Sequence, residues 1–270
     1  AERVIVENPE DEKKNNLKQK LLNENIHYMK EHGGRTVRTR IRSTIKAKKE
    51  FEEVGRKVRV HLPIPKVYEQ VSNVEIHASN PEITYIAPED APQRTVYFET
   101  ELKPDQEFMV DYSFDYHVNY VELDPAKVSE EQPDFYLEEQ APHIVFTPYL
   151  RELRDELAGD ERNPIILARR FYDFVTTKVM YSFMREYFTI ECIPEYCAIN
   201  LKGDCGVQAL LFITLCRMSG IPARWQSGLY ATEYYTGCHD WSQFYVAPYG
   251  WVFADLSFGG SAWRAGEKER

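Results

Sequence analysis

Residues 203–222 read GDCGVQALLFITLCRMSGIP, and this stretch decides how the C-terminal half of the chain folds. Glycines on both sides of Asp204 and Cys205 favour a sharp turn, and the apolar residues that follow occupy more than one face of a helix. Gly220 closes that helix and Pro222 prevents its return. The pattern predicts a buried helix that begins at or just before Cys205.

The start of this helix suits a nucleophile. The helix dipole and the free N–H groups there favour a thiolate at Cys205, and the same N–H groups could hold an oxyanion during acyl transfer. A nucleophilic cysteine also needs a base, and the base needs an orienting group. His239 begins one predicted strand and Asp255 ends the next, with a turn at residues 248–250 between them. The two side chains can therefore lie side by side, which predicts a Cys–His–Asp triad.

Three ordered motifs extend this reading. They are GDCGVQALLFITLCRMSGIPARWQSGLY at residues 203–230, HDWSQFYV at 239–246 and GWVFADLSFGG at 250–260. The set resembles the transglutaminase-like superfamily. Its members carry a cysteine at the start of a buried helix, an Arg-x-x-Gly-Ile-Pro-Ala-Arg exit, a His-x-Trp strand and an aspartate that ends a Gly-Trp strand. The resemblance covers residues 147–260.

The resemblance implies a papain-like catalytic domain with Cys205, His239 and Asp255 as its triad. It further implies a thiol-dependent acyl-transfer enzyme of bacterial type, a cysteine protease or amidase that acts on a peptide-like amide bond. Hydrolysis of a peptide or protein substrate is the favoured reaction. Two alternatives stay open, a protein-glutamine transamidase that forms cross-links and a non-catalytic interaction module on the same fold.

The sequence departs from the animal transglutaminases at two points. Those enzymes have a tryptophan before the cysteine that helps stabilise the oxyanion, whereas all four tryptophans of this chain follow Cys205. Tyr181 is our candidate for that role, and Trp241, Tyr234 and Tyr235 are candidates for the substrate cleft. The sequence also contains no calcium loop of the Asp-x-Asp-x-Asp-Gly kind, so we expect neither a metal nor a cofactor.

Strand periodicity of two dominates the N-terminal half, most clearly in the alternation of residues 108–120. The expected fold class is α+β, an antiparallel β-sandwich followed by a papain-like, transglutaminase-like catalytic domain. The expected divisions of the chain are a peripheral helical segment at 1–34, the β-sandwich at 35–121, a linker at 122–147 and the catalytic domain at 148–270.

Amino-acid composition limits the binding partners and the cellular compartment that we expect. The net charge of −10 disfavours a nucleic-acid partner, and no apolar run approaches the roughly 20 residues of a membrane span. The odd number of cysteines, five, fits a chain with a working thiol in a reducing compartment, which favours the cytoplasm. The oligomeric state cannot be predicted from the sequence.

Simpler readings of the same residues remain open. Cys205 could be a buried structural cysteine, and Asp255 could only cap a turn. Cys192 and Cys197, with Cys238 and His239, could bind zinc, although no second well-spaced ligand pair exists. The basic run at residues 35–59 could be a binding strip, but such residues more often form the solvated face of a sheet.

Overall fold

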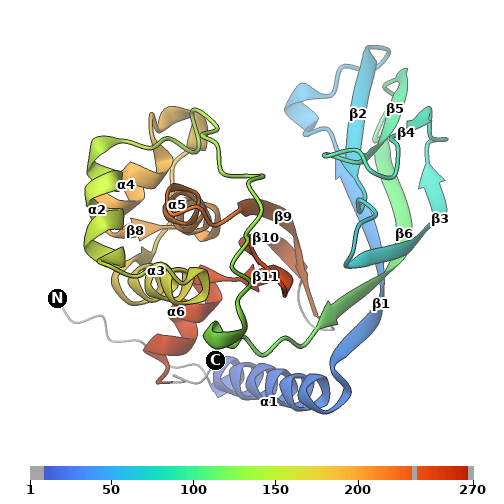
Figure 1. The fold of residues 1–270 in the computed structure, drawn as a ribbon. Helices are drawn as coiled ribbons and strands as arrows, with labels where there is room; N and C mark the ends of the chain where they lie inside the picture. The colour runs from blue at the N-terminus through green and yellow to red at the C-terminus, as the bar shows by residue number, and fades with distance from the viewer. Residues whose placement is uncertain (1–8, 233–235, 267–270) are drawn as a thin grey trace. The chain divides into compact units, whose positions relative to one another are not determined.

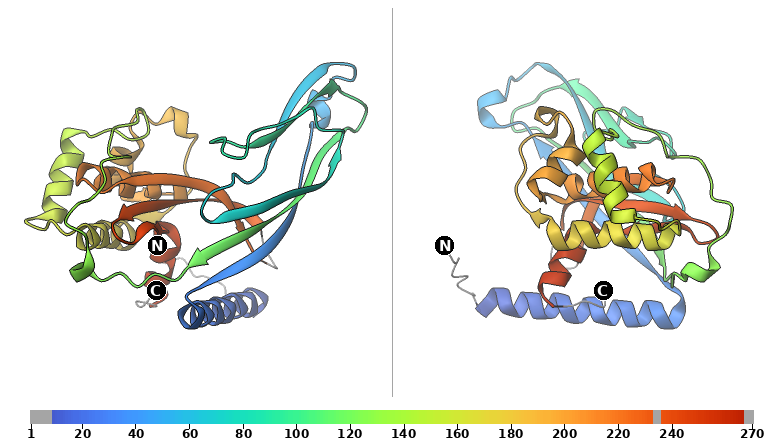
Figure 2. Two further views of the ribbon diagram at one scale, coloured as in Figure 1. Left: turned by 45° about the vertical axis from the view of Figure 1, so that its right-hand side comes forward. Right: turned by 60° about the vertical axis from the view of Figure 1, so that its left-hand side comes forward.

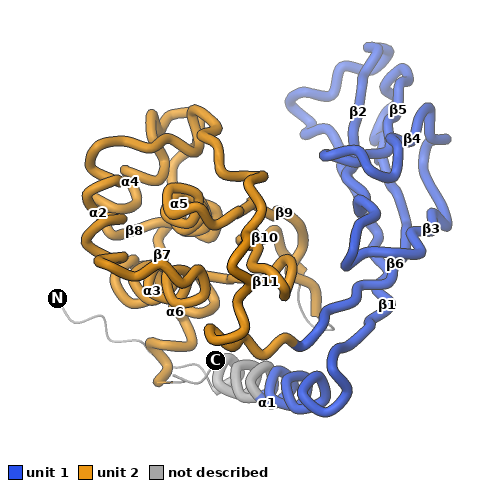
Figure 3. The backbone as a smooth tube through the Cα atoms, in the orientation of Figure 1, with its two compact units in different colours: residues 1–120 blue, residues 121–270 orange. Residues whose placement is uncertain are grey.

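The structure is a computed structural model that describes residues 9–232 and 236–266. The chain divides into two compact units, Ala1–Tyr120 and Val121–Arg270 (Figure 3). Residues 122–147, which the sequence suggests as a linker, fall within the second unit. Residues 122–147 form backbone and side-chain hydrogen bonds with the rest of this unit, among them Ser129 N–H to Ala247 O at 3.0 Å.

The first unit contains one long helix and two antiparallel sheets, in the strand orders β1-β6-β3 and β2-β5-β4 (Figure 1). Its elements are α1 (Pro9–His32), β1 (Gly34–Lys46), η1 (Lys49–Phe51), β2 (Lys57–Pro63), β3 (Val71–Asn80), β4 (Tyr85–Ile86), β5 (Thr95–Glu101) and β6 (Glu107–Asn119). One core joins the two sheets, with Val96 and Phe98 from β5 packed in the same cluster as Phe108 and Val110 from β6. The predicted antiparallel β-sandwich is confirmed.

The basic residues of β1 lie on the sheet face opposite this core. Arg40 and Arg42 both pair with the buried carboxylate of Asp111, at 2.7 and 2.9 Å, and Arg38 pairs with Asp115 at 3.1 Å. Hydrogen bonds from Arg40, the larger contribution, and from Arg42 lower the pKa of Asp111 to about 2. These arginines are therefore partnered across the sheet, as expected of a solvated sheet face.

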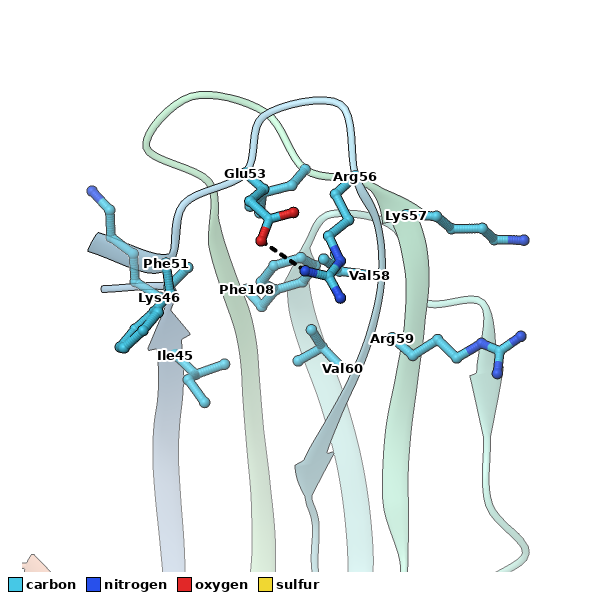
Figure 4. Close-up of a pocket in the computed structure, with 12 residues that line it drawn as sticks. Ile45, Lys46, Phe51, Glu53, Arg56, Lys57, Val58, Arg59, Val60 and Phe108 are labelled. Atoms are coloured by element: carbon cyan, nitrogen blue, oxygen red, sulfur yellow. Dashed lines mark hydrogen bonds and ion pairs between the residues drawn. The ribbon is translucent and has the colours of Figure 1, made fainter. Parts of the chain in front are cut away.

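One end of the sandwich contains an open pocket of about 420 Å³ (Figure 4). Its lining combines apolar side chains such as Ile45, Val60 and Phe108 with an ion pair between Arg56 and Glu53 at 2.8 Å. None of the predicted triad residues lines this pocket.

The second unit begins with helices and ends with an antiparallel sheet in the order β11-β10-β9. Its elements are η2 (Pro125–Lys127), α2 (Pro148–Ala158), α3 (Pro164–Lys178), β7 (Met180–Tyr181), η3 (Tyr187–Thr189), α4 (Ile193–Asn200), β8 (Lys202–Gly203), α5 (Cys205–Met218), β9 (Ala223–Ala231), β10 (Thr236–Val246), β11 (Gly250–Ala254) and α6 (Leu256–Arg264). Thr147 and Asn163 cap α2 and α3, and a proline follows each cap in the first turn.

Helix α5 is the centre of this unit. It contacts helices α2, α3, α4 and α6 as well as strands β9 and β10, so it lies between the other helices and the sheet (Figures 1 and 2). Every residue from Gly206 to Arg217 is buried. The predicted buried helix with Cys205 at its start is confirmed, and its environment explains why the sequence is apolar on all sides.

The structure differs from the sequence prediction at the ends of the sheet. Strand β10 begins at Thr236, not at His239, because its first residues pair with β9 in an unbroken register from Thr236↔Ala231 onward. Helix α6 was not predicted at all. None of the described helices is both long and apolar enough to cross a membrane.

Substitution of Phe212 tests how α5 packs against the sheet. Its side chain is fully buried and meets Phe244 of β10 edge-on, with 5.9 Å between ring centroids. Phe212→Ala should lower the free energy of unfolding of this unit by about 3–5 kcal/mol, because a large cavity would remain between helix and sheet. Denaturant unfolding measures the loss. The control is Phe188→Ala, whose side chain is 86% exposed and whose effect should stay within about 0.5 kcal/mol. Equal losses in the two variants would contradict the packing described.

Candidate active site

Cys205 is held in place by the turn that leads into α5. Asp204 caps the helix, since its Oδ1 accepts the Val207 N–H at 3.0 Å and also the Tyr187 hydroxyl at 2.6 Å. Strand β8, directly before this turn, pairs in parallel with β7, so that Gly203 lies beside Tyr181. The first turn of the helix is therefore anchored from two sides, with Cys205 at its first position.

His239 and Asp255 form a close pair at the end of the sheet. His239 Nε2 lies 2.6 Å from Asp255 Oδ2, and each side chain is only 11% exposed. The other carboxylate oxygen, Oδ1, accepts the Phe258 N–H at 3.0 Å and the Ser257 hydroxyl at 3.1 Å. Asp255 thus caps α6 with one oxygen and holds the imidazole with the other, so both readings of this residue apply at once.

Two aromatic rings fix the plane of the imidazole. His239 stacks on Phe258 with 4.5 Å between ring centroids and on Trp241 with 6.0 Å, each at an interplanar angle of 24°. Trp241 in turn packs on Phe253, and its indole Nε1 is buried without a hydrogen-bond partner among the described atoms. Trp241, a predicted cleft residue, thus supports the catalytic histidine candidate directly.

The charge state of His239 follows from its neighbours. Burial lowers the pKa of the ring, but hydrogen bonds with Asp255 and Cys205, together with their charges, raise it to about 10. The ring therefore holds its proton at neutral pH. The structure brings Cys205, His239 and Asp255 together in the order that the sequence predicts.

Tyr181 also lies beside the nucleophile. Its pKa is raised by partial burial, then by the charges of Cys205 and Asp204, and by a hydrogen bond with Cys205. The side chain remains 53% exposed. Its hydroxyl is therefore a proton donor at neutral pH next to the sulfur. Tyr234 and Tyr235, the other two predicted cleft residues, lie outside the described residues.

Asp240 is a neighbour of Cys205 that the sequence analysis missed. The Cys205 thiol donates to Asp240 Oδ2 at a sulfur–oxygen distance of 3.8 Å. Burial raises the pKa of Asp240, a hydrogen bond from Ser227 lowers it, and the charge of Asp204 raises it further. Its position between His239 and Trp241 in the HDW motif was the available signal. Phe258 carried no comparable signal, because it lies in the unpredicted helix α6.

The remaining cysteines do not form a metal centre within the described part of the chain. There, no three His, Cys, Asp or Glu side chains are grouped so that they could hold a metal ion. Burial raises the pKa of Cys197 to about 12 and that of Cys216 well above its ordinary value, so both thiols stay protonated at neutral pH.

Gly206 offers a test of this geometry. A methyl group at position 206 would overlap the Tyr187 hydroxyl and lie 2.9 Å from Asp240 Oδ2. Gly206→Ala should therefore destabilise the fold by about 1–3 kcal/mol, despite the higher helix propensity of alanine, and should slow alkylation of Cys205. Thermal unfolding and the rate of iodoacetamide labelling measure the two effects.

The matched variant Gly206→Ala with Tyr187→Phe removes the hydroxyl that the methyl group would meet. We expect it to recover part of the lost stability. A single variant as stable as the wild type, with unchanged labelling, would show that Tyr187 and Asp240 do not crowd the start of α5.

Known proteins support the fold. Residues 151–256 match the model of the transglutaminase-like superfamily, whereas no curated protein matches the chain. Among solved structures, the chain is similar to a "Putative Cysteine Protease" from Cytophaga hutchinsonii, at 17% identity over 83% of this chain and 79% of that chain, with a TM-score of 0.57. It is also similar to the periplasmic domain of TgpA from Pseudomonas aeruginosa, at 15% identity over 79% of this chain and 74% of that chain, with a TM-score of 0.47.

The family match spans the helices from α2 onward, the start of α5 with Cys205, and the strands that carry His239 and Asp255. The Cytophaga structure independently shares the fold. The chain therefore contains, at residues 151–256, a domain of the transglutaminase-like superfamily.

Proposed function

We propose that this protein is a thiol-dependent acyl-transfer enzyme that hydrolyses a peptide-like amide bond. The observation that carries the proposal is the connected series Asp255, His239 and Cys205. In it, a 2.6 Å hydrogen bond fixes the imidazole and a pKa raised to about 10 keeps it protonated beside the sulfur. A catalytic cysteine–histidine pair needs an imidazole ring that is held in place and that carries a proton for the leaving group.

The proposed reaction has two halves. The Cys205 thiolate attacks the amide carbonyl carbon, and the His239 imidazolium gives its proton to the leaving nitrogen as the carbon–nitrogen bond breaks. The products are a free amine and a thioester on Cys205. Water then attacks the thioester while neutral His239 takes its proton, and the carbon–sulfur bond breaks. The acid is released, and the thiolate and imidazolium are restored.

Two groups are available to stabilise the oxyanion. Cys205 is the first residue of α5, where backbone N–H groups point out of the helix and the dipole favours negative charge. The Tyr181 hydroxyl lies beside the sulfur and holds its proton at neutral pH because its pKa is raised. We assign the oxyanion to these two donors together.

Exposure near the sulfur favours water as the acceptor. Tyr181, which forms a hydrogen bond with Cys205, is 53% exposed. A site that transfers acyl groups to amines must keep water away from the thioester, and this open side chain offers little shielding. The same site could transfer the acyl group to an amine if a bound protein substrate covered it, so transamidation is the second candidate.

Activity profiling with electrophilic peptide probes tests the proposal. We expect a peptidyl acyloxymethyl ketone to label one residue of the native protein rapidly at neutral pH, and peptide mass mapping should identify it as Cys205. Cys238→Ser is the matched control, because Cys238 is exposed and lies one residue from His239, yet its loss should leave labelling intact. Uniformly slow labelling of all thiols would favour a non-catalytic interaction module instead.

Mass spectrometry of the products separates hydrolysis from transamidation. A peptide substrate is incubated with the enzyme in the presence of a primary amine. A new carboxylic acid identifies hydrolysis, and a new amide to the added amine identifies transfer.

A further inference from the structure

Asp240 is a carboxylate beside the nucleophile that the proposed mechanism does not use. Its Oδ2 lies 3.8 Å from the sulfur of Cys205, and Ser227, directly opposite on β9, donates a hydrogen bond to it. The other two carboxylates of the site have fixed partners, since Asp255 holds His239 and Asp204 caps α5. Among the residues that the structure describes, His239 is a positively charged group that acts on Asp240.

Strand geometry places Asp240 and His239 on opposite faces of β10. The two are consecutive residues of β10, whose register with β9 is unbroken from Thr236 to Phe244, so their side chains project to opposite faces. Ser242, two residues after Asp240, donates to Ala209 O of α5 at 3.4 Å, which shows that this face is the one against the helix. His239 and Asp240 thus both reach Cys205, each from its own face of the strand.

This arrangement assigns each side of the site to one part of the substrate. The leaving amine must lie next to His239, because that ring supplies its proton. Asp240, on the other side, must then lie beside the acyl part, which stays bonded to the sulfur. A carboxylate there attracts a positive group on the acyl part and repels a negative one.

We propose that Asp240 binds the protonated α-amino group of an amino-terminal residue, so that the enzyme prefers amide bonds whose carbonyl belongs to that residue. This inference rests on the proposed function. In an amino acid the α-nitrogen is ~2.5 Å from the carbonyl carbon. An attacking atom stands roughly 3–3.5 Å from that carbon, and a charged hydrogen bond spans about 2.8 Å. These three lengths can close a bent ring of four atoms, sulfur, carbon, nitrogen and oxygen, in which the sulfur and the oxygen are 3.8 Å apart.

The alternative cation, a lysine side chain on the acyl part, fits less well. Its ammonium stands on a flexible four-carbon stem and would reach past a carboxylate so close to the sulfur. Burial also raises the pKa of Asp240, and the nearby charge of Asp204 adds to this effect. A bound ammonium would offset the cost of keeping a partly buried carboxylate charged.

Two affinity labels that differ only at the nitrogen test the inference. Alanyl chloromethyl ketone has a free α-amino group, and acetyl-alanyl chloromethyl ketone has none. In each, the thiolate of Cys205 displaces chloride and forms a thioether. The measured quantity is the ratio of the two alkylation rates at Cys205, divided by the same ratio for glutathione to remove intrinsic reactivity.

We expect the wild-type ratio to favour the free amine about ten-fold or more, the size of a charged hydrogen bond. Asp240→Asn, which keeps the side-chain shape, should bring the ratio close to one. Asp240→Ser is a second variant in case the first is unstable, and thermal unfolding checks both. The matched control is Asp160→Asn, an exposed aspartate after α2, which should retain the wild-type ratio.

Two other outcomes are informative, one against the role of Asp240 and one against the proposed function. A ratio that is the same in the wild type and in both Asp240 variants overturns the inference, while labelling of Cys205 by the acetylated reagent leaves the proposed function standing. Absence of labelling at Cys205 by both reagents overturns the proposed function, and the inference with it.

Discussion

Cys205→Ala is expected to reduce turnover of any peptide amide that the wild-type protein cleaves by on the order of 10⁶-fold, the loss seen when the nucleophile of a catalytic triad is removed. The fold should survive, because the side chain lies at the start of α5 and is only partly buried, while the buried core of that helix begins at Gly206. Initial rates on a fluorogenic peptide amide give the first result, and the thermal unfolding midpoint gives the second.

Cys192→Ala is the matched control for this prediction. Cys192 is a partly buried free cysteine of the same unit, and it stands directly before α4 just as Cys205 begins α5. Its replacement should leave turnover within a few-fold of the wild type. If the Cys205 variant retained most of the activity, the nucleophile would have to be another group, and the proposed function would fail.

The start of α5 could be predicted from the sequence because its determinants are local. Glycines on both sides of Asp204 and Cys205, followed by a long apolar run, specify one buried helix with its N-terminus at Cys205. The alternation of residues 108–120 likewise specifies a strand with one face toward a core, and β6 contributes Phe108 and Val110 to that core. In both cases neighbouring residues carry the whole signal.

The missed features depend on contacts between distant segments. Thr236 and Gly237 have the composition of a loop, yet they extend β10 because β9 offers them a partner strand. Phe258 reaches His239 only because Asp255 caps a short helix immediately after the last strand. Asp240 would be an ordinary exposed residue of a strand if the start of α5 did not lie beside it. Sequence periodicity does not report such encounters.

Asp255→Asn is the second variant with a large expected effect. In the wild type, burial lowers the pKa of His239, but the hydrogen bonds that its ring donates to Asp255 and Cys205, with the charges of these groups, raise it to about 10. Asparagine keeps the size of the side chain but removes the charge, so only Cys205 would then offset burial, and the pKa of His239 should fall from about 10 toward its ordinary value of about 6.5. At neutral pH the imidazolium that protonates the leaving amine would be largely lost. We expect turnover to fall by up to about 10⁴-fold, as when the orienting carboxylate of a serine triad is neutralised.

The pH dependence identifies the cause of that loss. The reactive form of the wild type requires protonated His239, so the basic limb of kcat/KM should lie near pH 10, and in Asp255→Asn it should move down by several pH units. Stability should follow the same sign. A folded pKa above the unfolded value contributes stability fully below about pH 6.5, and this contribution disappears as pH rises toward 10. The variant should therefore lose more stability at pH 6 than at pH 10.

Asp255 also caps α6, and the asparagine side-chain oxygen can still accept the Phe258 N–H. If capping α6 were the only role of Asp255, the substitution would not move the basic limb of kcat/KM. A variant with low activity but an unmoved basic limb would show that Asp255 acts only on the helix.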